Sequence, residues 1–315
     1  MNTLLILSPE AEAYARLLAR HDLPELTILQ ATTVQQARPQ LSSVNLLMGL
    51  PEYLAAVLAE TPQLQWVQST SAGVNELCVA GLRRDYQLTN ARGVFGELMS
   101  EYVFAYLLAQ ERKLLDYARH QQAGEWVAYN RYPYRRLSEL TLGVIGLGSI
   151  GQQVARTGAH FGMRVLGMKR TPEPVPAVEQ VYGLEQLAEF LPQLDYLVMV
   201  LPATPETRHF AHAEFFRLLK PEAVLINVGR GATLDETALV QALDAGQLRQ
   251  AVLDVFETEP LPPHSPLWTH PGVVLTPHVS ALSFPAQIAG LFVENYRRFL
   301  RGAALQYPVD FARGY

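Results

Sequence analysis

The stretch TLGVIGLGSIG, residues 141–151, decides the fold of this chain. It starts with an apolar run that suits a buried strand. Gly146, Gly148 and Gly151 then follow in G-x-G-x-x-G spacing, with Ser149 and Ile150 before the last glycine. With a helix expected directly afterwards, the first glycine permits a tight turn, the second admits a pyrophosphate close to the backbone, and the third allows close helix–strand packing. The helix N-terminus would face the phosphate charge, so the stretch predicts a dinucleotide-binding unit.

The same alternation of strand and helix runs through the rest of the chain. Short runs rich in Leu, Val and Ile alternate with segments whose apolar positions recur every three or four residues. This βαβ rhythm predicts parallel sheets covered by helices on both faces, in two doubly wound units with a cleft between them. Strands are expected at 3–8, 26–30, 45–49, 66–69, 141–148, 164–168, 195–202, 223–229, 250–256 and 273–278, and helices at 12–20, 51–60, 149–161, 184–191, 213–220, 235–246 and 286–302.

Two segments between the series differ from this pattern. Residues 100–122 keep helical periodicity over an unusual length, which predicts a single long helix that links two domains. The segment 124–140 is aromatic and irregular, and either a connector or a surface arm fits it.

The composition favours a soluble protein with a substantial core. With 315 residues, 49% of them hydrophobic, the chain can form about two domains. A net charge of −5 without a basic run argues against nucleic acid and anionic membranes as partners. The sequence shows no signal peptide and no membrane span, and Cys78, the single cysteine, permits neither an intrachain disulfide nor a cysteine-based metal site. We therefore expect a soluble, cytoplasmic protein.

The end of the strand 164–168 carries cations where NAD-binding units carry an acid. A carboxylate about 20 residues beyond the glycines usually binds the ribose hydroxyls of NAD. Here Lys169, Arg170 and Thr171 occupy the site, and no acid follows until Glu173. Two cations and a hydroxyl suit a 2′-phosphate, which a carboxylate would repel. The triplet therefore favours NADP(H) over NAD(H), although NAD(H) is possible if these are solvated loop charges.

Three polar residues stand at or beyond the ends of later strands, where open α/β sheets bind ligands. Arg230 follows the strand 223–229 and can grip a substrate carboxylate with two hydrogen bonds. His278 ends the segment VVLTPH and suits proton transfer near neutral pH. Glu259, in DVFETEPLP, can bind the far nitrogen of the histidine and favour its protonated form, with Glu257 as a rival for that role.

In joint register these motifs resemble the D-isomer-specific 2-hydroxyacid dehydrogenases. GVIGLGSIG, LPATPET, NVGRGATLDE, LDVFETEPLP and PLWTHPGVVLTPHVS follow the signatures of that family in order, and the resemblance extends to QSTSAGVNEL at residues 68–77. One departure is Asn75, where many members have Asp. The resemblance implies a Rossmann cofactor domain, residues 101–283, inserted in a flavodoxin-like substrate domain, residues 1–100 and 284–315. It also implies a homodimer formed through the cofactor domain.

The resemblance also implies a role for each matching residue. Arg230 would hold the substrate carboxylate and polarise the 2-oxo group, His278 would exchange a proton with the substrate oxygen, and Glu259 would orient His278, selected over Glu257 by the DVFxxEP pattern. Backbone N–H groups of Ala72, Gly73 and Val74 would bind the same carboxylate. Asp254 would hold the nicotinamide amide. Further cofactor contacts would come from residues of the glycine turn, the cationic triplet and the strand ends, and include Gly146, Gly148, Ser149, Ile150, Gly151, Lys169, Arg170, Thr171, Leu201, Pro202, Thr204, Thr207, Val228, Gly229 and His278.

The substrate expectation follows from the same comparison. The loop STSAGVN has no Lys or Arg for a substrate phosphate, and the triplet KRT with the tail VDFARGY resembles the short NADPH-linked glyoxylate/hydroxypyruvate reductases. We therefore expect reduction of glyoxylate or hydroxypyruvate with NADPH. Two alternatives stay open: an NAD-dependent dehydrogenase of the D-lactate or phosphoglycerate type, and a nucleotide-sensing interaction protein.

Overall fold

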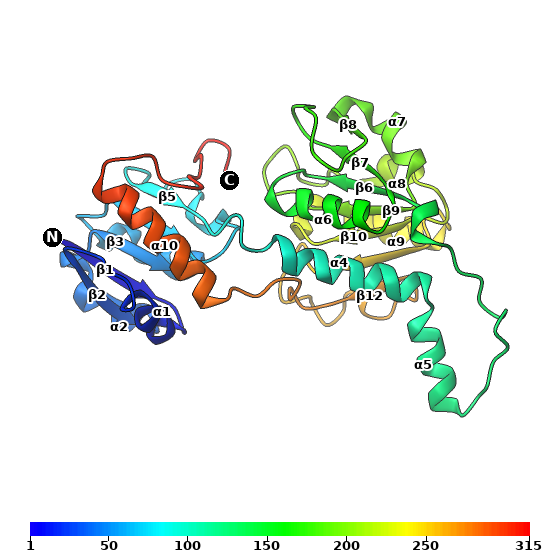
Figure 1. Cartoon of the computed structure of the whole chain (residues 1–315), viewed down its shortest axis with the longest axis horizontal. Helices are drawn as coiled ribbons and strands as arrows, with labels where there is room; N and C mark the ends of the chain where they lie inside the picture. The colour runs from blue at the N-terminus through cyan, green and yellow to red at the C-terminus, as the bar shows by residue number, and fades with distance from the viewer. The chain divides into compact units, whose positions relative to one another are not determined.

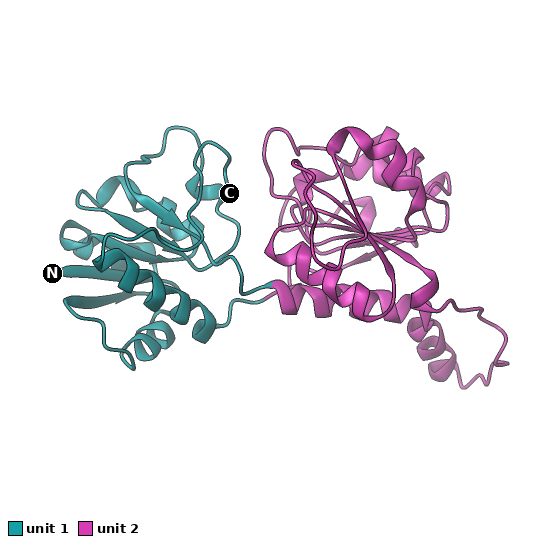
Figure 2. Cartoon of the chain, turned by 45° about the horizontal axis from the view of Figure 1, so that its top comes forward, with its two compact units in different colours: residues 1–95, 282–315 teal, residues 96–281 magenta.

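The computed structural model describes all 315 residues and divides them into two compact units. Unit 1 comprises residues 1–95 and 282–315, and unit 2 comprises residues 96–281 (Figure 2). The boundary expected after residue 100 falls inside the first helix of unit 2, which begins at Gly96. No helix in the structure combines the length and the apolar character that a bilayer span requires.

Unit 1 is built on a five-stranded parallel sheet with the strand order β2-β1-β3-β4-β5. Most residues of its central strands are buried and apolar, as expected for a sheet with helices on both faces. The strand β5 was not expected, because its three residues are too few to show a periodic pattern. The elements are β1 (Asn2–Leu7), α1 (Ala11–Leu18), β2 (Leu26–Ala31), α2 (Val34–Ala37), β3 (Leu46–Gly49), α3 (Pro51–Ala55), β4 (Trp66–Ser69), β5 (Gln87–Thr89) and α10 (Pro285–Leu300).

The last helix of the chain, α10, completes this first unit. Its Phe292 stacks on Trp66 of β4 with 4.9 Å between the ring centroids, and its buried Asn295 donates to the side-chain oxygen of Gln68. Figure 1 shows α10, in orange, beside the blue strands from the start of the chain. The two ends of the sequence therefore share one core, although nearly two hundred residues separate them.

Unit 2 contains a seven-stranded parallel sheet with the order β12-β11-β10-β9-β6-β7-β8. As in unit 1, a three-residue strand, β8, was not expected. The structure therefore has two parallel-sheet α/β domains, which confirms the fold class predicted from the βαβ rhythm. The elements are α4 (Gly96–Glu111), α5 (Leu114–Ala123), β6 (Thr141–Ile145), α6 (Ser149–His160), β7 (Arg164–Met168), β8 (Gln180–Tyr182), α7 (Leu187–Phe190), β9 (Tyr196–Met199), α8 (Ala213–Arg217), β10 (Val224–Asn227), α9 (Glu236–Asp244), β11 (Gln250–Leu253) and β12 (Val273–Leu275).

The direction of winding in this sheet changes at β6. From β6 the chain moves through α6 to β7 on one side, and it later returns to β9 on the other side. Right-handed crossovers then place α6 and α8 on opposite faces of the sheet. The loops after β6 and β9 diverge at this point, which is where open α/β sheets bind nucleotides.

The expected single helix over residues 100–122 is wrong, because the structure has two helices there. Lys113 adopts a left-handed conformation with φ of 53° and separates α4 from α5. Seven residues of α4 are buried, whereas α5 has none. The periodic pattern is continuous in the sequence, but only its first part packs on the core, so the chain is free to turn where packing ends.

Residues 114–134, which comprise α5 and the loop after it, form an arm that projects from unit 2 (Figure 1). Of the two readings left open for the aromatic segment, the surface arm is the one observed. Trp126 is fully exposed and Tyr129 is 92% exposed. The arm has its own internal contact, since the ring of His120 bridges Glu125 and Tyr132 with two distances of 2.7 Å.

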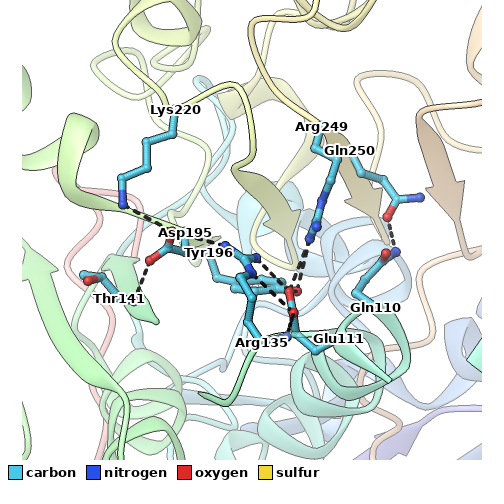
Figure 3. A network of polar contacts seen from close by, with 9 residues as sticks. All are labelled: Gln110, Glu111, Arg135, Thr141, Asp195, Tyr196, Lys220, Arg249 and Gln250. Carbon is cyan, nitrogen blue, oxygen red and sulfur yellow. Dashed lines mark hydrogen bonds and ion pairs between the residues drawn. The ribbon is translucent and has the colours of Figure 1, made fainter. Parts of the chain in front are cut away.

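A polar network anchors the chain on both sides of this arm to the sheet (Figure 3). The buried carboxylate of Glu111, at the end of α4, accepts hydrogen bonds from Arg135 and Tyr196 at 2.7 Å each, and Arg249 lies at 3.4 Å. Asp195 binds Arg135 and also accepts the backbone N–H of Thr141. Thr141, Tyr196 and Arg249 lie at or directly before the starts of β6, β9 and β11. The network therefore belongs to the edge of the sheet opposite the strand ends that carry the expected site.

Candidate active site

The glycine turn after β6 has the geometry that close backbone approach requires. Gly146 has φ of 96°, and a Cβ atom there would lie 2.6 Å from the carbonyl oxygen of Val200. A Cβ atom on Gly151 would lie 2.0 Å from the carbonyl oxygen of Gly146, so only glycine lets α6 pack this closely on β6. Gly148 instead faces open space, with nothing within 4 Å of a Cβ. The first and third glycines are thus needed by the fold, while the second leaves room for a ligand.

The cations expected to read the cofactor lie in the loop after β7. Lys169 is partly buried, and its ammonium lies 3.5 Å from the carboxylate of Glu173. Arg170 and Thr171 are exposed. Backbone and Thr204 hydrogen bonds lower the pKa of Glu206 after β9, and the positive charge of Arg170 makes a smaller contribution in the same direction. The loop therefore carries two cations and one acid that is paired with the first of them.

Two further loops line the carboxyl edge of the sheet. After β9, the Thr207 hydroxyl donates to the carbonyl oxygen of Pro202 at 2.6 Å and accepts the N–H of Thr204 at 2.8 Å, which closes the loop on itself. After β10, a Cβ on Gly229 would lie 2.7 Å from the backbone nitrogen of Leu201. The backbones of the two loops therefore touch, and Val228 beside Gly229 is buried.

Arg230 follows this contact and is held by its neighbours. Its backbone carbonyl accepts the Thr233 hydroxyl at 2.6 Å and the side-chain amide of Asn227 at 3.3 Å. One guanidinium nitrogen donates to the carbonyl oxygen of Gly229 at 2.8 Å. The next residue, Gly231, leaves no space for a Cβ, which would lie 1.9 Å from the backbone carbon of Phe256. Backbone packing thus fixes the position of the Arg230 backbone, from which the guanidinium extends.

Glu259 and His278 form a hydrogen-bonded pair. The Nδ1 atom of His278 lies 2.7 Å from Oε2 of Glu259, while Oε1 accepts the backbone N–H of Phe256 at 2.9 Å. A carboxylate only accepts, so Nδ1 carries the hydrogen and Nε2 points elsewhere. The bond to Glu259 raises the pKa of His278 above its usual value, against partial burial and the charge of Arg230, which lower it. Burial raises the pKa of Glu259, but hydrogen bonds from His278 and Phe256 outweigh it and lower that pKa.

Glu257, the rival for this role, lies in a different cluster. Its carboxylate lies 2.9 Å from the ring of His209 and 3.7 Å from the guanidinium of Arg208, and its backbone N–H donates to Glu236 at 2.8 Å. Of the two glutamates in the motif, the structure therefore brings only Glu259 to His278.

Asp254 is fully buried and bonded to the segment that carries His278. Its carboxylate accepts the Thr276 hydroxyl at 2.6 Å and the backbone N–H groups of Val279 and Ser280 at 2.8 Å each. The carboxylate thus contacts groups of the chain itself. The nicotinamide contact that the family resemblance implies for Asp254 stays a prediction.

The expected carboxylate-binding turn lies in unit 1, after β4. Val74 is buried and begins a short helical turn, and the side-chain amide of Asn90 donates to the carbonyl oxygen of Ala72 at 2.8 Å. The N–H groups of Ala72, Gly73 and Val74 donate to no backbone carbonyl. Successive backbone N–H groups in a turn can bind an anion.

Comparison with known proteins assigns the chain to a family. Residues 104–280 match the model of the NAD-binding domain of D-isomer-specific 2-hydroxyacid dehydrogenases, which covers more than half of the chain. A glyoxylate/hydroxypyruvate reductase A from Serratia proteamaculans is 35% identical over 268 residues, which are 82% of this chain and 84% of that protein. The chain belongs to the D-isomer-specific 2-hydroxyacid dehydrogenase family.

Solved structures of this oxidoreductase family agree with the fold. A D-isomer-specific 2-hydroxyacid dehydrogenase family protein from Aeromonas salmonicida is 48% identical, with a TM-score of 0.93 over 98% of this chain and 99% of that one. An NADPH-dependent glyoxylate/hydroxypyruvate reductase from Sinorhizobium meliloti, solved with NADP and sulfate, is 30% identical, with a TM-score of 0.87 over the whole of both chains. The family membership expected from the motifs is therefore confirmed.

Three residues of this dehydrogenase site had no signal in the sequence. Asn227 is buried at the end of β10 and bonds to Gly229 and Arg230, and Thr276 bonds to Asp254. Tyr102 of α4 reaches Thr276 from 174 residues away in the chain. Polar residues next to strand ends are common, and only the tertiary contacts distinguish these three from solvated neighbours.

The residues present fit a dinucleotide. A pyrophosphate needs open space beside the backbone, and Gly148 leaves such space at the start of the twelve-residue helix α6. The N-terminus of this helix supplies N–H donors and the positive end of the helix dipole. A side chain at that position would occupy this space. Lys169 and Arg170 follow β7, which is the strand next to β6, at the same carboxyl edge of the sheet.

Proposed function

We propose that this chain reduces a small 2-oxo acid, glyoxylate or hydroxypyruvate, with NADPH, to the 2-hydroxy acid, of D configuration where the product is chiral. The bond between Glu259 and the Nδ1 atom of His278 carries the proposal, because it leaves Nε2 of a readily protonated imidazole to serve the substrate. The named relatives from Serratia and Sinorhizobium support the choice of substrates.

In this proposal each side chain has a separate task. NADPH, when bound, supplies the hydride that reduces C2 of the substrate. Protonated His278 donates its Nε2 proton to the 2-oxo oxygen, so the product leaves as an alcohol and the imidazole is left neutral. Glu259 accepts from Nδ1 in both states and keeps the ring oriented. Arg230 binds the substrate carboxylate and draws electron density from the adjacent carbonyl. The turn at Ala72, Gly73 and Val74 is predicted to bind the carboxylate as well.

The cofactor preference rests on the loop after β7. Lys169 and Arg170 can pair with a 2′-phosphate, and the Sinorhizobium relative was solved with NADP. Glu173 pairs with Lys169 at 3.5 Å, so one cation is already neutralised in part. A 2′-phosphate would compete with Glu173 for Lys169. In an NAD-linked enzyme, a carboxylate would instead bind the ribose hydroxyls. NADPH is therefore proposed, and the NAD-linked D-lactate or phosphoglycerate type stands as the alternative.

Steady-state rates with glyoxylate and hydroxypyruvate, each with NADPH and with NADH, test both parts of the proposal. We expect turnover of at least one acid and a kcat/KM at least tenfold higher with NADPH. The double variant Lys169→Asp/Arg170→Ala should lose most of its NADPH rate and favour NADH, because a carboxylate repels the 2′-phosphate. Turnover of neither acid would refute the substrate class. An unchanged nucleotide preference in the double variant would show that these cations are bystanders.

The remaining parts of the proposal are a homodimer and a cytoplasmic location. The arm at residues 114–134 supports the former, because a fully exposed Trp126 and an almost fully exposed Tyr129 are more typical of a covered surface. The domain roles are proposed with it: unit 2 as the dinucleotide-binding domain and unit 1 as the substrate domain.

A further inference from the structure

The backbone at His278 needs support. This residue has φ of 54°, a left-handed conformation that is disfavoured for any residue with a β-carbon. Its N–H donates to the carbonyl oxygen of Asp254 at 2.8 Å and to that of Thr276 at 3.0 Å. Its ring is half exposed, so little side-chain packing holds it. The position of the imidazole therefore depends on what fixes the backbone on both sides.

Asp254 supplies that support. Its carboxylate accepts the N–H groups of Val279 and Ser280, the two residues after His278, and the hydroxyl of Thr276, two residues before it. One buried carboxylate thus holds both flanks of the histidine. Hydrogen bonds to an ionised group are short and strong, and these lie between 2.6 and 2.8 Å.

The direction of the next bond follows from donor and acceptor chemistry. The hydroxyl of Tyr102 lies 2.6 Å from Oγ1 of Thr276. The single hydroxyl hydrogen of Thr276 is used toward Asp254, because an ionised carboxylate can only accept. Tyr102 must therefore donate to Thr276. The result is a directed chain in which Tyr102 of α4 donates to Thr276, and Thr276 donates to Asp254.

We propose that Tyr102 and Thr276 are positioning residues for His278, acting through Asp254. This inference rests on the proposed function, in which His278 is the proton donor. The hydroxyl chain fixes one carboxylate oxygen, and the carboxylate fixes the backbone that presents the imidazole to Glu259. No sequence motif links Tyr102 to this site. Loss of either hydroxyl removes a bond of this chain between partly buried groups, and we expect the segment 276–280 to shift in response.

The predicted consequence is measurable at the imidazole itself. The charged groups that act on His278 are Glu259, Arg230 and Asp254. A shift of the segment lengthens the Nδ1 bond to Glu259, which is the main cause of the raised pKa of His278, so that pKa should fall. Misplacement of the proton donor should lower kcat roughly tenfold and leave KM for the 2-oxo acid nearly unchanged.

The decisive comparison is Thr276→Val against Thr276→Ser. Valine keeps the shape and removes the hydroxyl, whereas serine keeps the hydroxyl. NMR titration of the His278 ring in the intact protein, assigned with His278→Gln, gives its pKa in each variant, and kcat and KM are measured in parallel. Thr276→Val should show the lower pKa and lower kcat, and Thr276→Ser should restore both. Tyr102→Phe should change both quantities in the same direction by a smaller amount.

An unchanged His278 pKa and kcat in Thr276→Val would overturn the proposal, as would a Thr276→Ser variant that is impaired as much as Thr276→Val. If Thr276→Val does not fold, Tyr102→Phe decides, and normal values for both quantities would then overturn it. The NMR titration requires no substrate. A wild-type protein that turns over neither glyoxylate nor hydroxypyruvate would refute the proposed substrates, while the pKa comparison would still report on positioning.

Discussion

At the scale of single residues, the site depends on which of two nearby glutamates reaches the histidine. Glu257 and Glu259 are two positions apart, in the same loop after β11. The structure turns Glu259 to His278 at 2.7 Å and Glu257 to His209 at 2.9 Å. The two carboxylates are chemically identical, so each can serve as the control for the other.

Substitution of Glu259 should change the pH dependence of reduction. The bond to Glu259 raises the pKa of His278, so the proton donor stays charged to higher pH and the rate falls only as pH rises through that pKa. In Glu259→Gln the pKa should fall, and the loss of kcat/KM should begin at lower pH. His278→Gln should lower kcat by roughly 100- to 10,000-fold and leave the Kd for NADPH nearly unchanged.

The pH profile of kcat/KM, with Glu257→Gln as the matched control, checks this prediction. Glu257→Gln alters a cluster that does not contact His278 and should keep the wild-type profile. If Glu257→Gln moved the profile and Glu259→Gln did not, the assignment of the pair would be reversed.

At the scale of elements, the glycines in the turn from β6 to α6 meet different requirements, some of the fold and one of a ligand. Gly151 lies where a Cβ would collide with the carbonyl oxygen of Gly146 and would also approach Val144 to 3.2 Å. Gly148 has φ of −74°, which any residue can adopt, and open space around it. The motif thus contains one position that the helix–strand contact requires and one that a ligand requires.

Alanine substitutions should distinguish these two requirements. Gly151→Ala should lower the free energy of unfolding by about 1–3 kcal/mol, as overpacking does, because α6 must move away from β6. Gly148→Ala should leave the stability nearly unchanged and weaken NADPH binding, since the methyl group enters the space kept for the pyrophosphate. Urea denaturation and nucleotide titration by calorimetry measure the two effects. Equal NADPH affinity in Gly148→Ala and the wild type would place the pyrophosphate elsewhere.

At the scale of the whole molecule, the two edges of the seven-stranded sheet have different tasks. The carboxyl edge bears the glycine turn and the His278–Glu259 pair, and the opposite edge bears the Glu111 network. Burial by itself raises the pKa of Glu111, but hydrogen bonds from Arg135 and Tyr196 and the charge of Arg249 outweigh burial and lower the pKa to about 2. The buried carboxylate is therefore stabilised in its charged form.

Stability should then depend on acid through Glu111. Its folded pKa lies below the unfolded value of 4.5, so its contribution is fully present above about pH 4.5 and is lost as pH falls toward 2. The difference corresponds to about 3 kcal/mol at neutral pH. Glu111→Gln should lower the free energy of unfolding by a comparable amount at pH 7, and the gap to wild type should narrow below pH ~4.5.

Urea denaturation of wild type and Glu111→Gln between pH 7 and pH 3 tests this expectation. Glu139→Gln is a suitable control, because Glu139 forms an exposed ion pair with Arg136 outside the network and should have little effect. A gap that stays constant over the whole pH range would mean that Glu111 acts through packing and not through its charge.

The sequence by itself determined the α/β class, the family and the residues that were candidates for chemistry. These features depend on local patterns: apolar runs of strand length, glycines at fixed spacing, and polar residues directly after strands. Such patterns are present in the chain whatever its tertiary arrangement, so they can be read without it.

Only the tertiary structure decided how distant polar groups pair. The break at Lys113, the burial of Asp254 and the contact from Tyr102 to Thr276 have no local signal, and the bond from Glu259 to His278 is seen only in the structure. Each depends on which group is desolvated beside which partner, and partners up to 174 residues apart meet only when the sheet and its helices have assembled. Which buried groups form hydrogen bonds with one another depends on packing, so these pairs could be identified only from the folded structure and not from the sequence motifs.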